Sequence, residues 1–437
     1  MKIAILGYAS QGAAAYRYWS SGDHEITICD QNPKLSAPTD TTTQLGKKYL
    51  ENLDQYDLLV RTPALHPKNI LAANPKSPHI LDKVTTVTDE FMRVCPTKNI
   101  IGVTGTKGKG TTSTLIAKML EAAGKRVHLG GNIGIPPLEM LKNDIQPDDW
   151  VVLELANFQL IDLKISPHIG VCLMVEPEHM DWHEDIEEYI AAKQQLFINQ
   201  SEQDIAIYYA KNENSEAVAS ATEGTLIPYF EEPGATVEDN YICIGNKKVV
   251  NVSEIKLLGE HNWQNVCAAL TAFWQIKKDL AAAKTITSNF GGLPFRIERR
   301  LQKKGITFYN DSFATANGAT IAAIKAIPEK KVLIIGGFDR GLNLEHLVGT
   351  IQHEAVNIRK VLVIGASAQR LKQAFDQAKF ANYQLEPAQT MPEIISSALQ
   401  FAKPGDAVVL SPGFASFDMF KNFEDRGQQF NKAVDEL

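Results

Sequence analysis

The sequence predicts an α/β protein built of three domains. Short apolar runs, typical of buried parallel strands, alternate along the chain with stretches of helical periodicity. Glycine-rich turns join several of these runs to the helix that follows, which is the layout of nucleotide-binding α/β folds. The 437 residues exceed what one hydrophobic core usually accommodates, so we expect about two to four domains on length alone.

Composition and charge exclude several classes of protein. The chain has 44% hydrophobic and 22% charged residues, as ordinary globular proteins do, and no apolar stretch approaches the roughly 20 residues of a membrane span. The N-terminus enters the strand-like run Lys2–Leu6 at once, without the layout of a signal peptide. The net charge of −7 does not indicate a nucleic-acid partner. We therefore expect a cytoplasmic protein with no membrane or nucleic-acid partner.

The cysteines agree with that compartment. The five cysteines are scattered at positions 29, 95, 172, 243 and 267 and form no C-x-x-C pair. This distribution is typical of buried free thiols in a reducing cytoplasm, and it does not indicate disulfides or a zinc site.

The first domain, residues 1–95, is predicted to be Rossmann-like. A buried strand at Ile3–Leu6 is followed by the turn 7–12, which opens a helix, and a second strand at Ile26–Cys29 leads into Asp30. An acidic residue at the end of the second strand is typical of dinucleotide-binding units. An alanine holds the middle glycine position of the turn, however, so a plain tight strand–helix turn is the alternative.

The central domain, residues 96–288, is predicted to be a mononucleotide-binding domain of the P-loop ATPase type. The segment Val103–Thr112 reads V-T-G-T-K-G-K-G-T-T. It follows the apolar run Ile100–Val103 and precedes a helical pattern that Gly124 ends. Glycines let the backbone curl so that its N–H groups point at phosphate oxygens, and the helix N-terminus adds partial positive charge.

Side chains of this segment supply the remaining parts of a phosphate site. Lys109 can reach the outer phosphates, and the hydroxyl of Thr111 or Thr112 can bind Mg²⁺. The match to G-x-x-x-x-G-K-[ST] is imperfect, because Val103 holds the first glycine position and Gly110 holds that of the metal-binding hydroxyl. A simple glycine-rich turn is the alternative; the strand–turn–helix context favours the phosphate loop.

Two later residues are candidates for the same metal. Glu154 lies near the end of the apolar run Trp150–Leu155, where a carboxylate is costly to bury unless it is paired or bound to a cation. His179 follows the next predicted strand, Ile169–Val175. Because ligands bind at the carboxyl ends of such strands, both residues can join Thr111 around Mg²⁺ beside the phosphates.

Other polar residues nearby are most simply interpreted as residues without a functional role. A single histidine such as His179 is more often an ordinary loop residue than a ligand. Asp181 and His183 are expected to be solvated. Lys193, within the helix predicted at Ile186–Phe197, is by default a surface lysine whose stem covers apolar surface.

The C-terminal domain, residues 289–437, is predicted to be a second Rossmann-like domain, and Gly291–Pro294 marks the linker before it. Four apolar runs alternate with helical stretches, as in a doubly wound sheet. The runs are Ile306–Asn310, Val332–Ile335, Val361–Ile364 and Ala407–Leu410.

Motifs along nearly the whole chain occur in one order that resembles the Mur ligases. After the phosphate loop come Glu154-Leu155-x-x-Phe158-Gln159-Leu160, Glu178-His179-Met180-Asp181, Gly259-x-His261-Asn262-x-x-Asn265, Leu293-Pro294-x-Arg296-x-Glu298, Asn310-Asp311-Ser312-x-Ala314-Thr315, Gly336-Gly337-x-Asp339, Leu410-Ser411-Pro412, Ser416-Phe417-Asp418 and Phe420-x-Asn422-Phe423-Glu424-x-Arg426-Gly427.

The resemblance implies an ATP-dependent amide-bond ligase of peptidoglycan precursor synthesis. In that family a substrate carboxylate attacks the γ-phosphate of ATP, and an amine then attacks the acyl phosphate. The resemblance is strongest to members that add D-glutamate to UDP-N-acetylmuramoyl-L-alanine. It implies ATP, Mg²⁺ at two sites, these small-molecule substrates and a monomeric enzyme.

The resemblance also assigns roles residue by residue. It implies that Lys109, Glu154, His179 and Lys193 are catalytic. The expected metal-binding residues are Thr111, Glu154, His179 and a carbamylated Lys193. The expected ATP-binding residues are Gly105, Thr106, Lys107, Gly108, Lys109, Gly110, Thr111, Thr112, Asn265, Arg296 and Asp311. The expected UDP-substrate residues are Gly7, Tyr8, Ala9, Ser10, Gln11, Gly12, Asp30, Thr62 and Asn132. The expected amino-acid-binding residues are Thr315, Arg340, Ser411, Ser416 and Phe423.

Departures from the family pattern leave the substrate open. Phe313 and Arg340 stand where the family has lysines, and Gly110 resembles the G-K-G-[ST] loop of the folylpolyglutamate synthases. Replacing lysine by phenylalanine removes a carboxylate partner and adds an apolar face. The alternatives are a Mur-type ligase for another amino acid, such as L-glutamate, or another acceptor, and a catalytically silent paralogue that binds a UDP-sugar.

Overall fold

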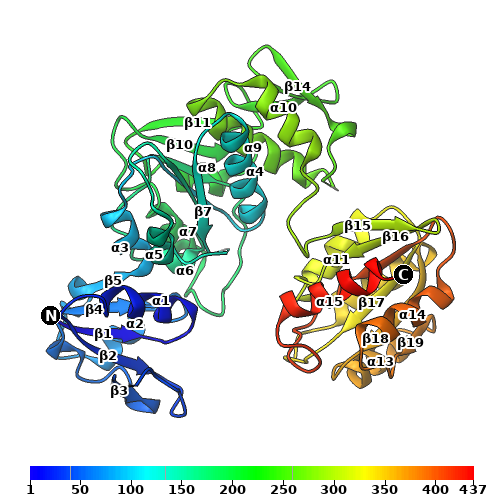
Figure 1. Ribbon diagram of the computed structural model, residues 1–437, viewed down its shortest axis with the longest axis horizontal. Coiled ribbons are helices and arrows are strands. Elements are labelled where there is room, and N and C mark those ends of the chain that lie inside the picture. Colours follow the sequence, from blue (N-terminus) through cyan, green and yellow to red (C-terminus); the bar gives the residue numbers. More distant parts are fainter. Residues whose placement is uncertain (40, 133, 258) are drawn as a thin grey trace. The chain divides into compact units, whose positions relative to one another are not determined.

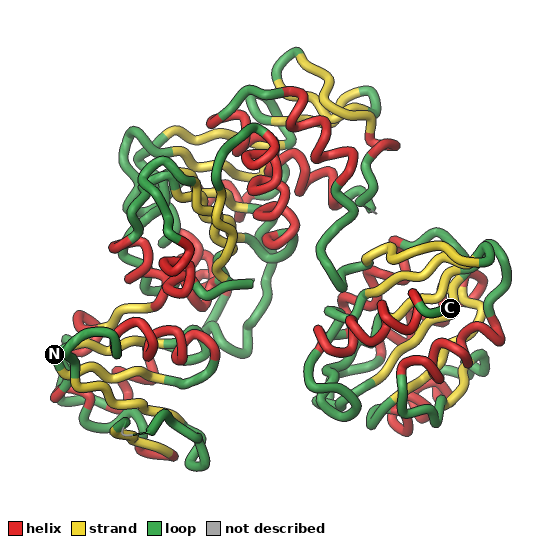
Figure 2. The backbone as a smooth tube through the Cα atoms, in the orientation of Figure 1, coloured by secondary structure: helices red, strands yellow, loops and turns green. Residues whose placement is uncertain are grey.

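The computed structural model describes residues 1–39, 41–132, 134–257 and 259–437. The chain forms two compact units. The first comprises Met1–Ile255 and Glu260–Asn289, and the second comprises Lys256–Gly259 and Phe290–Leu437. In both units strands gather into sheets with helices packed around them (Figures 1 and 2). The prediction of an α/β fold with parallel sheets is therefore confirmed.

The first sheet of the first unit has five parallel strands in the order β3-β2-β1-β4-β5. The strands are β1 (Lys2–Leu6), β2 (Glu25–Asp30), β3 (Thr42–Leu45), β4 (Leu58–Arg61) and β5 (Val84–Thr86), and the helices are α1 (Ser10–Trp19), α2 (Pro67–Ala73) and α3 (Val87–Val94). Strands β1 and β4 are neighbours although β2 and β3 come between them in sequence. The order of the sheet reverses at this point, and the carboxyl ends of such strands form the ligand crevice of open α/β sheets.

The second sheet of this unit has six parallel strands in the order β11-β10-β9-β6-β8-β7. The strands are β6 (Ile100–Thr104), β7 (Val127–Gly131), β8 (Trp150–Glu154), β9 (Ile169–Cys172), β10 (Ile205–Tyr209) and β11 (Thr225–Tyr229). Its helices are α4 (Lys109–Ala122), α5 (Pro137–Met140), α6 (Asn157–Leu160), α7 (Ile186–Gln194), α8 (Glu213–Ala219), α9 (His261–Ile276) and α10 (Leu280–Asn289). Every residue of β6 and β8 is buried, which explains their unbroken apolar runs.

Several element boundaries differ from the sequence prediction. Helix α7 ends at Gln194, because the next residues continue as a tight turn in which the N–H of Leu196 bonds to the carbonyl of Lys193. The turn-rich stretch 210–255 contains α8, β11 and a three-stranded antiparallel sheet of β12 (Ala235–Glu238), β13 (Tyr241–Ile244) and β14 (Lys247–Asn251). Short strands with exposed polar residues give little periodic signal.

The first and second sheets share one hydrophobic core. Ile5 and Val60, from the first sheet, belong to the same buried cluster as Phe91 of α3, Leu153 of β8 and Leu160 of α6. The carboxyl ends of β1 and β4 are thereby joined by apolar packing to the sheet that carries the glycine-rich loop.

The second unit contains one six-stranded sheet in the order β15-β16-β20-β17-β18-β19, in which only β15 is antiparallel. The strands are β15 (Glu298–Lys303), β16 (Ile306–Asn310), β17 (Lys331–Gly336), β18 (Ile358–Ile364), β19 (Tyr383–Leu385) and β20 (Ala407–Leu410). The helices are α11 (Asn317–Ala326), α12 (Glu345–His353), α13 (Ala368–Gln377), α14 (Met391–Phe401) and α15 (Phe423–Asp435). The prediction missed β15, a charged edge strand without an apolar run.

Helices cover both faces of this sheet. Along β17, Leu333 and Ile335 belong to a core cluster with residues of α11, α12 and α13. Val332 and Ile334 point the other way, into a cluster with residues of α14 and α15. The alternation of strand side chains between two apolar layers is that of a doubly wound sheet.

Two expectations about the whole chain can be compared with the structure. All five cysteines are buried free thiols, as predicted. Among the described residues, no helix combines the length and the apolar character that crossing a membrane requires.

Candidate active site

The glycine-rich loop lies between β6 and α4, as a phosphate loop requires. Gly108 precedes α4 with a φ of +88°, and a Cβ there would lie 2.1 Å from Oδ1 of Asn265. Glycine is therefore needed for both backbone conformation and space. The Nζ of Lys109 folds back over the loop and donates to the carbonyl oxygens of Gly105 and Thr106, at 2.9 Å each. The loop thus places a cation at the start of a 14-residue helix.

The two threonines that follow differ in their surroundings. Thr112 is fully buried, and its hydroxyl lies 3.5 Å from Oδ1 of Asn265, which itself belongs to α9. Thr111 is only partly buried. Asn265 thus contacts the loop from α9, and the side chain of Thr112 is directed toward that helix.

Glu154 carries an unpaired buried oxygen at the end of β8. The residue is 3% exposed, and Oε1 accepts a hydrogen bond from the Nδ2 of Asn132 at 2.9 Å. Oε2 is buried and has no hydrogen-bond partner within the described parts of the chain. A buried carboxylate oxygen without a donor is costly, so it fits a position beside a cation.

His179 occupies a strained turn after β9. Its φ is +60°, a left-handed conformation that is uncommon for residues with a Cβ, and its side chain is 41% exposed. The backbone N–H groups of Trp182 and His183 both donate to the His179 carbonyl at 3.0 Å, which closes the turn. The imidazole packs against Phe158 of α6, with ring centroids 4.7 Å apart.

Lys193 is not the surface residue that its helical position suggests by default. It is 1% exposed, and its Nζ donates to the carbonyl of Gly105 at 3.3 Å. The same Nζ lies 4.4 Å from the ring centroid of Tyr189. Burial, reinforced by the Lys109 cation, lowers the pKa of Lys193 to about 7. The structure therefore places a readily deprotonated amine beside the phosphate loop.

His183 is buried, and the expectation that it is solvated is wrong. Its Nδ1 lies 3.1 Å from Oε2 of Glu188, and its Nε2 lies 2.6 Å from the Nδ2 of Asn157. The Nε2 of His66 lies 3.2 Å from Oε1 of the same carboxylate. Burial lowers the pKa of both histidines, so Glu188 separates two rings that are neutral near pH 7. Asp181 is exposed, as predicted.

These three side chains have the composition of a metal site, since their ligand atoms lie within 4.8 Å of one another. The hydrogen bonds argue against one. Nδ1 of His66 accepts from the backbone N–H of Lys68 at 3.1 Å, so in the neutral ring the proton is on Nε2. That protonated nitrogen lies 3.2 Å from Glu188 in a geometry that forms no hydrogen bond, and it has no lone pair for a metal. The cluster of His66, His183 and Glu188 is therefore a polar link between the loop after β4 and α7.

The loop after β1 meets the loop after β4 at the crevice of the first sheet. Gly7 has a φ of +98°, and a Cβ there would lie 2.3 Å from the hydroxyl oxygen of Thr62. That hydroxyl donates to the carbonyl of Leu6 at 2.7 Å. One carboxylate oxygen of Asp30 accepts from the backbone N–H of Tyr8 at 2.8 Å. The structure thus brings together the predicted UDP-substrate residues of the turn 7–12, Asp30 and Thr62.

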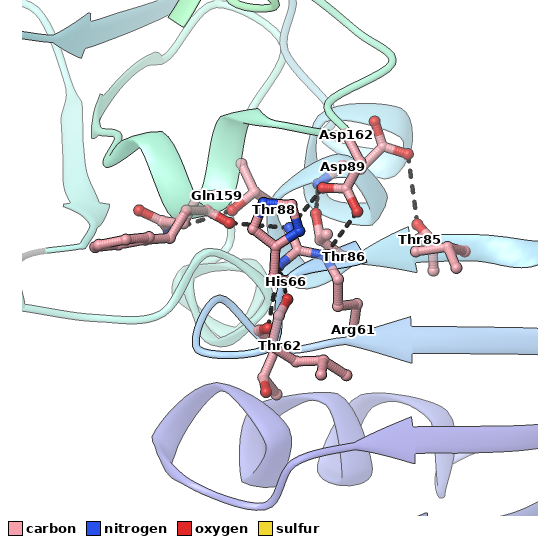
Figure 3. Close-up of polar contacts among 12 residues, drawn as sticks. Arg61, Thr62, His66, Thr85, Thr86, Thr88, Asp89, Gln159 and Asp162 are labelled. Atoms are coloured by element: carbon pink, nitrogen blue, oxygen red, sulfur yellow. Dashed lines mark hydrogen bonds and ion pairs between the residues drawn. The ribbon is translucent and has the colours of Figure 1, made fainter. Parts of the chain in front are cut away.

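A buried arginine to which the sequence analysis gave no role of its own ties this crevice to the segment after α6 (Figure 3). Arg61, at the end of β4, forms two hydrogen bonds to the carboxylate of Asp162, at 2.7 and 2.6 Å. Its Nη1 donates to the carbonyls of Thr62 and Leu65, and its Nη2, which also binds Asp162, donates to the carbonyl of Phe158. The side chain is fully buried. An arginine directly after an apolar strand is a signal that could have identified it.

In the second unit, a buried carboxylate organises several predicted residues. Asp311 is 4% exposed; its Oδ2 lies 2.6 Å from the hydroxyl of Ser411, and its Oδ1 accepts from the N–H of Ile297 at 3.0 Å. Burial raises the pKa of Asp311 to about 7. Arg340 donates to the carbonyl of Thr315 at 2.7 Å.

A second buried arginine, which stands in a family motif but received no role from the sequence, contacts these loops. Arg426 is fully buried and donates to the hydroxyl and the carbonyl of Ser312 and to the carbonyl of Phe414. It thereby holds the segment after β16 against the segment after β20. Ser416 is buried in the second of these segments, and the ring of Phe423 packs against that of Phe313.

Comparison with known proteins agrees with this arrangement. Residues 103–273 match the Mur ligase middle domain, and residues 295–414 match the Mur ligase, glutamate ligase domain. A UDP-N-acetylmuramoylalanine–D-glutamate ligase of Clostridium kluyveri is 35% identical, over 90% of this chain and 86% of the relative. A protein of the same name from Acetivibrio thermocellus is 33% identical, over 100% of this chain and 96% of the relative.

Solved structures agree at the level of the fold. A UDP-N-acetylmuramate–alanine ligase from Thermotoga maritima has a TM-score of 0.61 at 16% identity, covering 100% of this chain and 99% of that one. A Mur ligase from the same organism in complex with ADP has a TM-score of 0.58 at 15% identity, covering 99% of this chain and 94% of that one. The fold, the phosphate loop and these relatives define an ATP-dependent ligase. More particularly, the chain belongs to the Mur ligase family.

Proposed function

We propose that this ligase joins D-glutamate to UDP-N-acetylmuramoyl-L-alanine through an acyl phosphate, in the synthesis of peptidoglycan precursors. The observation that carries the proposal is the similarity, along the full chain, to relatives named for that reaction. The first sheet would bind the uridine diphosphate end of the acceptor, the second sheet ATP, and the second unit the amino acid together with part of ATP. We likewise propose the three-domain division 1–95, 96–288 and 289–437, in which the first two domains together make up most of the first compact unit.

The phosphate loop of the first unit would hold ATP. The loop backbone and Lys109 would bind the β- and γ-phosphates at the N-terminus of α4. Asn265 contacts the loop at Thr112, which supports a place for Asn265 beside the nucleotide. Arg296 and Asp311 would contact phosphate and ribose.

The residues present fit Mg²⁺. Glu154 offers a buried carboxylate oxygen that has no donor among the described residues, and Thr111 is the more accessible of the two loop hydroxyls. His179 would serve a second ion. When bound, Mg²⁺ offsets negative charge on the transferring phosphoryl group.

Lys193 would be carbamylated. Its neutral amine attacks the carbon of CO₂, the N–C bond forms, and the amine proton leaves to solvent, so that a carbamate anion replaces a cation. Two observations support this: the low pKa of the amine and its position against Gly105 O, where the Lys109 ammonium already lies. An anion on residue 193 would attract Lys109 where a cation repels it.

The proposed chemistry has two steps. The acceptor carboxylate attacks the γ-phosphorus of ATP, ADP leaves, and the product is an acyl phosphate. The amine of glutamate then attacks the acyl carbon, and the tetrahedral intermediate collapses with loss of inorganic phosphate. Lys109 would stabilise charge on the transferring group, while Thr315, Arg340, Ser411, Ser416 and Phe423 would line the amino-acid pocket.

Phosphate release tests the proposal. Purified protein with ATP, Mg²⁺ and UDP-N-acetylmuramoyl-L-alanine should release phosphate with D-glutamate, and with no other member of a panel of D- and L-amino acids. Turnover with a different amino acid would contradict the choice of D-glutamate and make Arg340 the candidate determinant of a changed specificity. No phosphate release with any of the amino acids would contradict the proposal and favour a role in binding only.

A further inference from the structure

The side chain of Arg296 lies over the ring of Phe313 in the second unit. The guanidinium carbon is 3.8 Å from the ring centroid, a close stacking contact. The ring of Phe423 stands at 85° to that of Phe313, with centroids 4.9 Å apart. Phe313 therefore does not project freely, although it is 38% exposed; it packs against an arginine and a second aromatic ring.

The backbone around Arg296 is strained and firmly held. Both neighbours adopt left-handed conformations, with φ of +62° at Phe295 and +46° at Ile297, which are rare for such side chains. The N–H of Ile297 donates to Asp311, and the N–H of Phe313 donates to the carbonyl of Phe295 at 2.9 Å. Strain of this kind persists where surrounding contacts enforce it, and it concentrates at functional sites. Here it directs Arg296 onto Phe313.

We propose that Phe313 is a positioning residue for ATP, and that it does not select the amino acid. Its ring is a platform that fixes the Arg296 guanidinium for the nucleotide phosphates. The inference rests on the proposed function, in which Arg296 contacts ATP.

The chemistry of the pair supports this role. A guanidinium held over an aromatic face is attracted by the ring, and it loses less freedom when it binds an anion. A leucine would keep apolar contact without the attraction of the ring's electrons for a cation. A lysine would remove the ring and add a cation that itself attracts phosphate, so Phe313→Leu is the cleaner test.

Calorimetric titration of the full chain with a non-hydrolysable ATP analogue and Mg²⁺ tests the proposal. Phe313→Leu should weaken binding about three- to tenfold, whereas Phe313→Tyr, which keeps the ring, should bind as wild type does. Phe401→Leu is the matched control, because Phe401 faces Lys360 in the same unit at 5.4 Å, away from these loops. It should leave binding unchanged.

A double-mutant cycle separates positioning from a general structural effect. In an Arg296→Ala background, Phe313→Leu should cause no further loss of nucleotide affinity. An equal loss with and without Arg296, or a Phe313→Tyr variant as weak as Phe313→Leu, would overturn the proposal. So would an unchanged nucleotide affinity with a raised KM for the amino acid. The titration needs neither acceptor nor amino acid, so failure of the proposed ligation would be recognised separately.

Discussion

Lys109 and Lys193 direct their Nζ atoms at one carbonyl oxygen, that of Gly105, at 2.9 and 3.3 Å. They come from helices 84 positions apart by residue number (193 minus 109), and only the folded chain brings them together. Two adjacent cations repel each other, and burial makes the charge on Lys193 more costly still. The pair explains why a modification that reverses the charge of Lys193 would stabilise the site.

Removal of the Lys193 amine should abolish most activity. Lys193→Ala is expected to lower kcat at least about 100-fold, the scale seen when a charge-stabilising group is lost. Lys193→Arg should not restore the rate, because the proposed role needs an anion and arginine stays cationic. Phosphate-release assays with added bicarbonate or acetate test the idea further: chloride rescuing Lys193→Ala better than these anions would contradict it.

The stability of the protein should depend on pH through Lys193. Its pKa falls from 10.5 to about 7 on folding, so between these values the unfolded chain holds a proton that the native protein lacks. Stability relative to Lys193→Met should therefore rise with pH across this window, by up to about 1.4 kcal/mol per pH unit. Urea denaturation in CO₂-free buffer at pH 7 and pH 9 measures it. A pH-independent difference would contradict the assigned pKa.

Glu154→Gln tests the unpaired carboxylate oxygen. The amide keeps an oxygen for Asn132 but removes the negative charge, so we expect a folded protein whose activity falls at least about 100-fold. The thermal midpoint should hold or increase, because an unpaired buried charge has been removed. Direct Mn²⁺ binding, followed by electron paramagnetic resonance, should weaken. Wild-type Mn²⁺ affinity in this variant would exclude Glu154 as a ligand.

The cluster of His66, His183 and Glu188 should contribute to stability. Glu188→Gln removes the negative charge that bonds to His183 and lies beside His66, and we expect a loss of about 1–3 kcal/mol in the free energy of unfolding. Glu184→Gln is the control, since its pair with Lys68 joins the same two segments at the surface. Chemical denaturation should show little effect there; equal losses in both variants would mean that burial of the cluster contributes nothing.

Arg61 and Asp162 should matter more than any exposed ion pair. Asp162→Asn leaves a buried guanidinium without its anion, which we expect to destabilise the first unit by about 3–5 kcal/mol. Glu231→Gln, which breaks the exposed contact with Lys211, should cost less than about 1 kcal/mol. If denaturation midpoints of the two variants coincide, the link from β4 to α6 is not a stabilising contact.

Most strands were predictable from the sequence because a strand that is buried on both faces consists almost entirely of apolar residues. The strands β6, β8 and β17 are buried along their whole length and appear in the sequence as apolar runs. The glycines before α4 likewise indicate a loop at that position. β15 was missed because an edge strand with charged residues carries no such pattern. Local sequence thus predicts strands that are buried along their whole length, and it does not predict an exposed edge strand such as β15.

Site residues were predictable from the sequence only where their role depends on neighbouring residues in the chain. Lys193 and His183 look like ordinary polar residues in sequence, and their burial depends on partners such as Gly105 and His66, which are distant in the chain. Arg61 and Arg426 likewise bind carbonyl groups of loops far along the sequence. Periodicity cannot report contacts of this kind, since they are set by how the sheets and their loops pack.

Isotope transfer tests the central claim most directly. UDP-N-acetylmuramoyl-L-alanine labelled with ¹⁸O in its carboxylate should be incubated with the protein, ATP, Mg²⁺ and D-glutamate, and the released phosphate analysed by mass spectrometry. An acyl phosphate leaves with one carboxylate oxygen, so the phosphate should carry a single ¹⁸O atom, with the other retained in the new amide. Unlabelled phosphate formed alongside the ligated product would contradict the mechanism, and the absence of any product would contradict the assigned reaction.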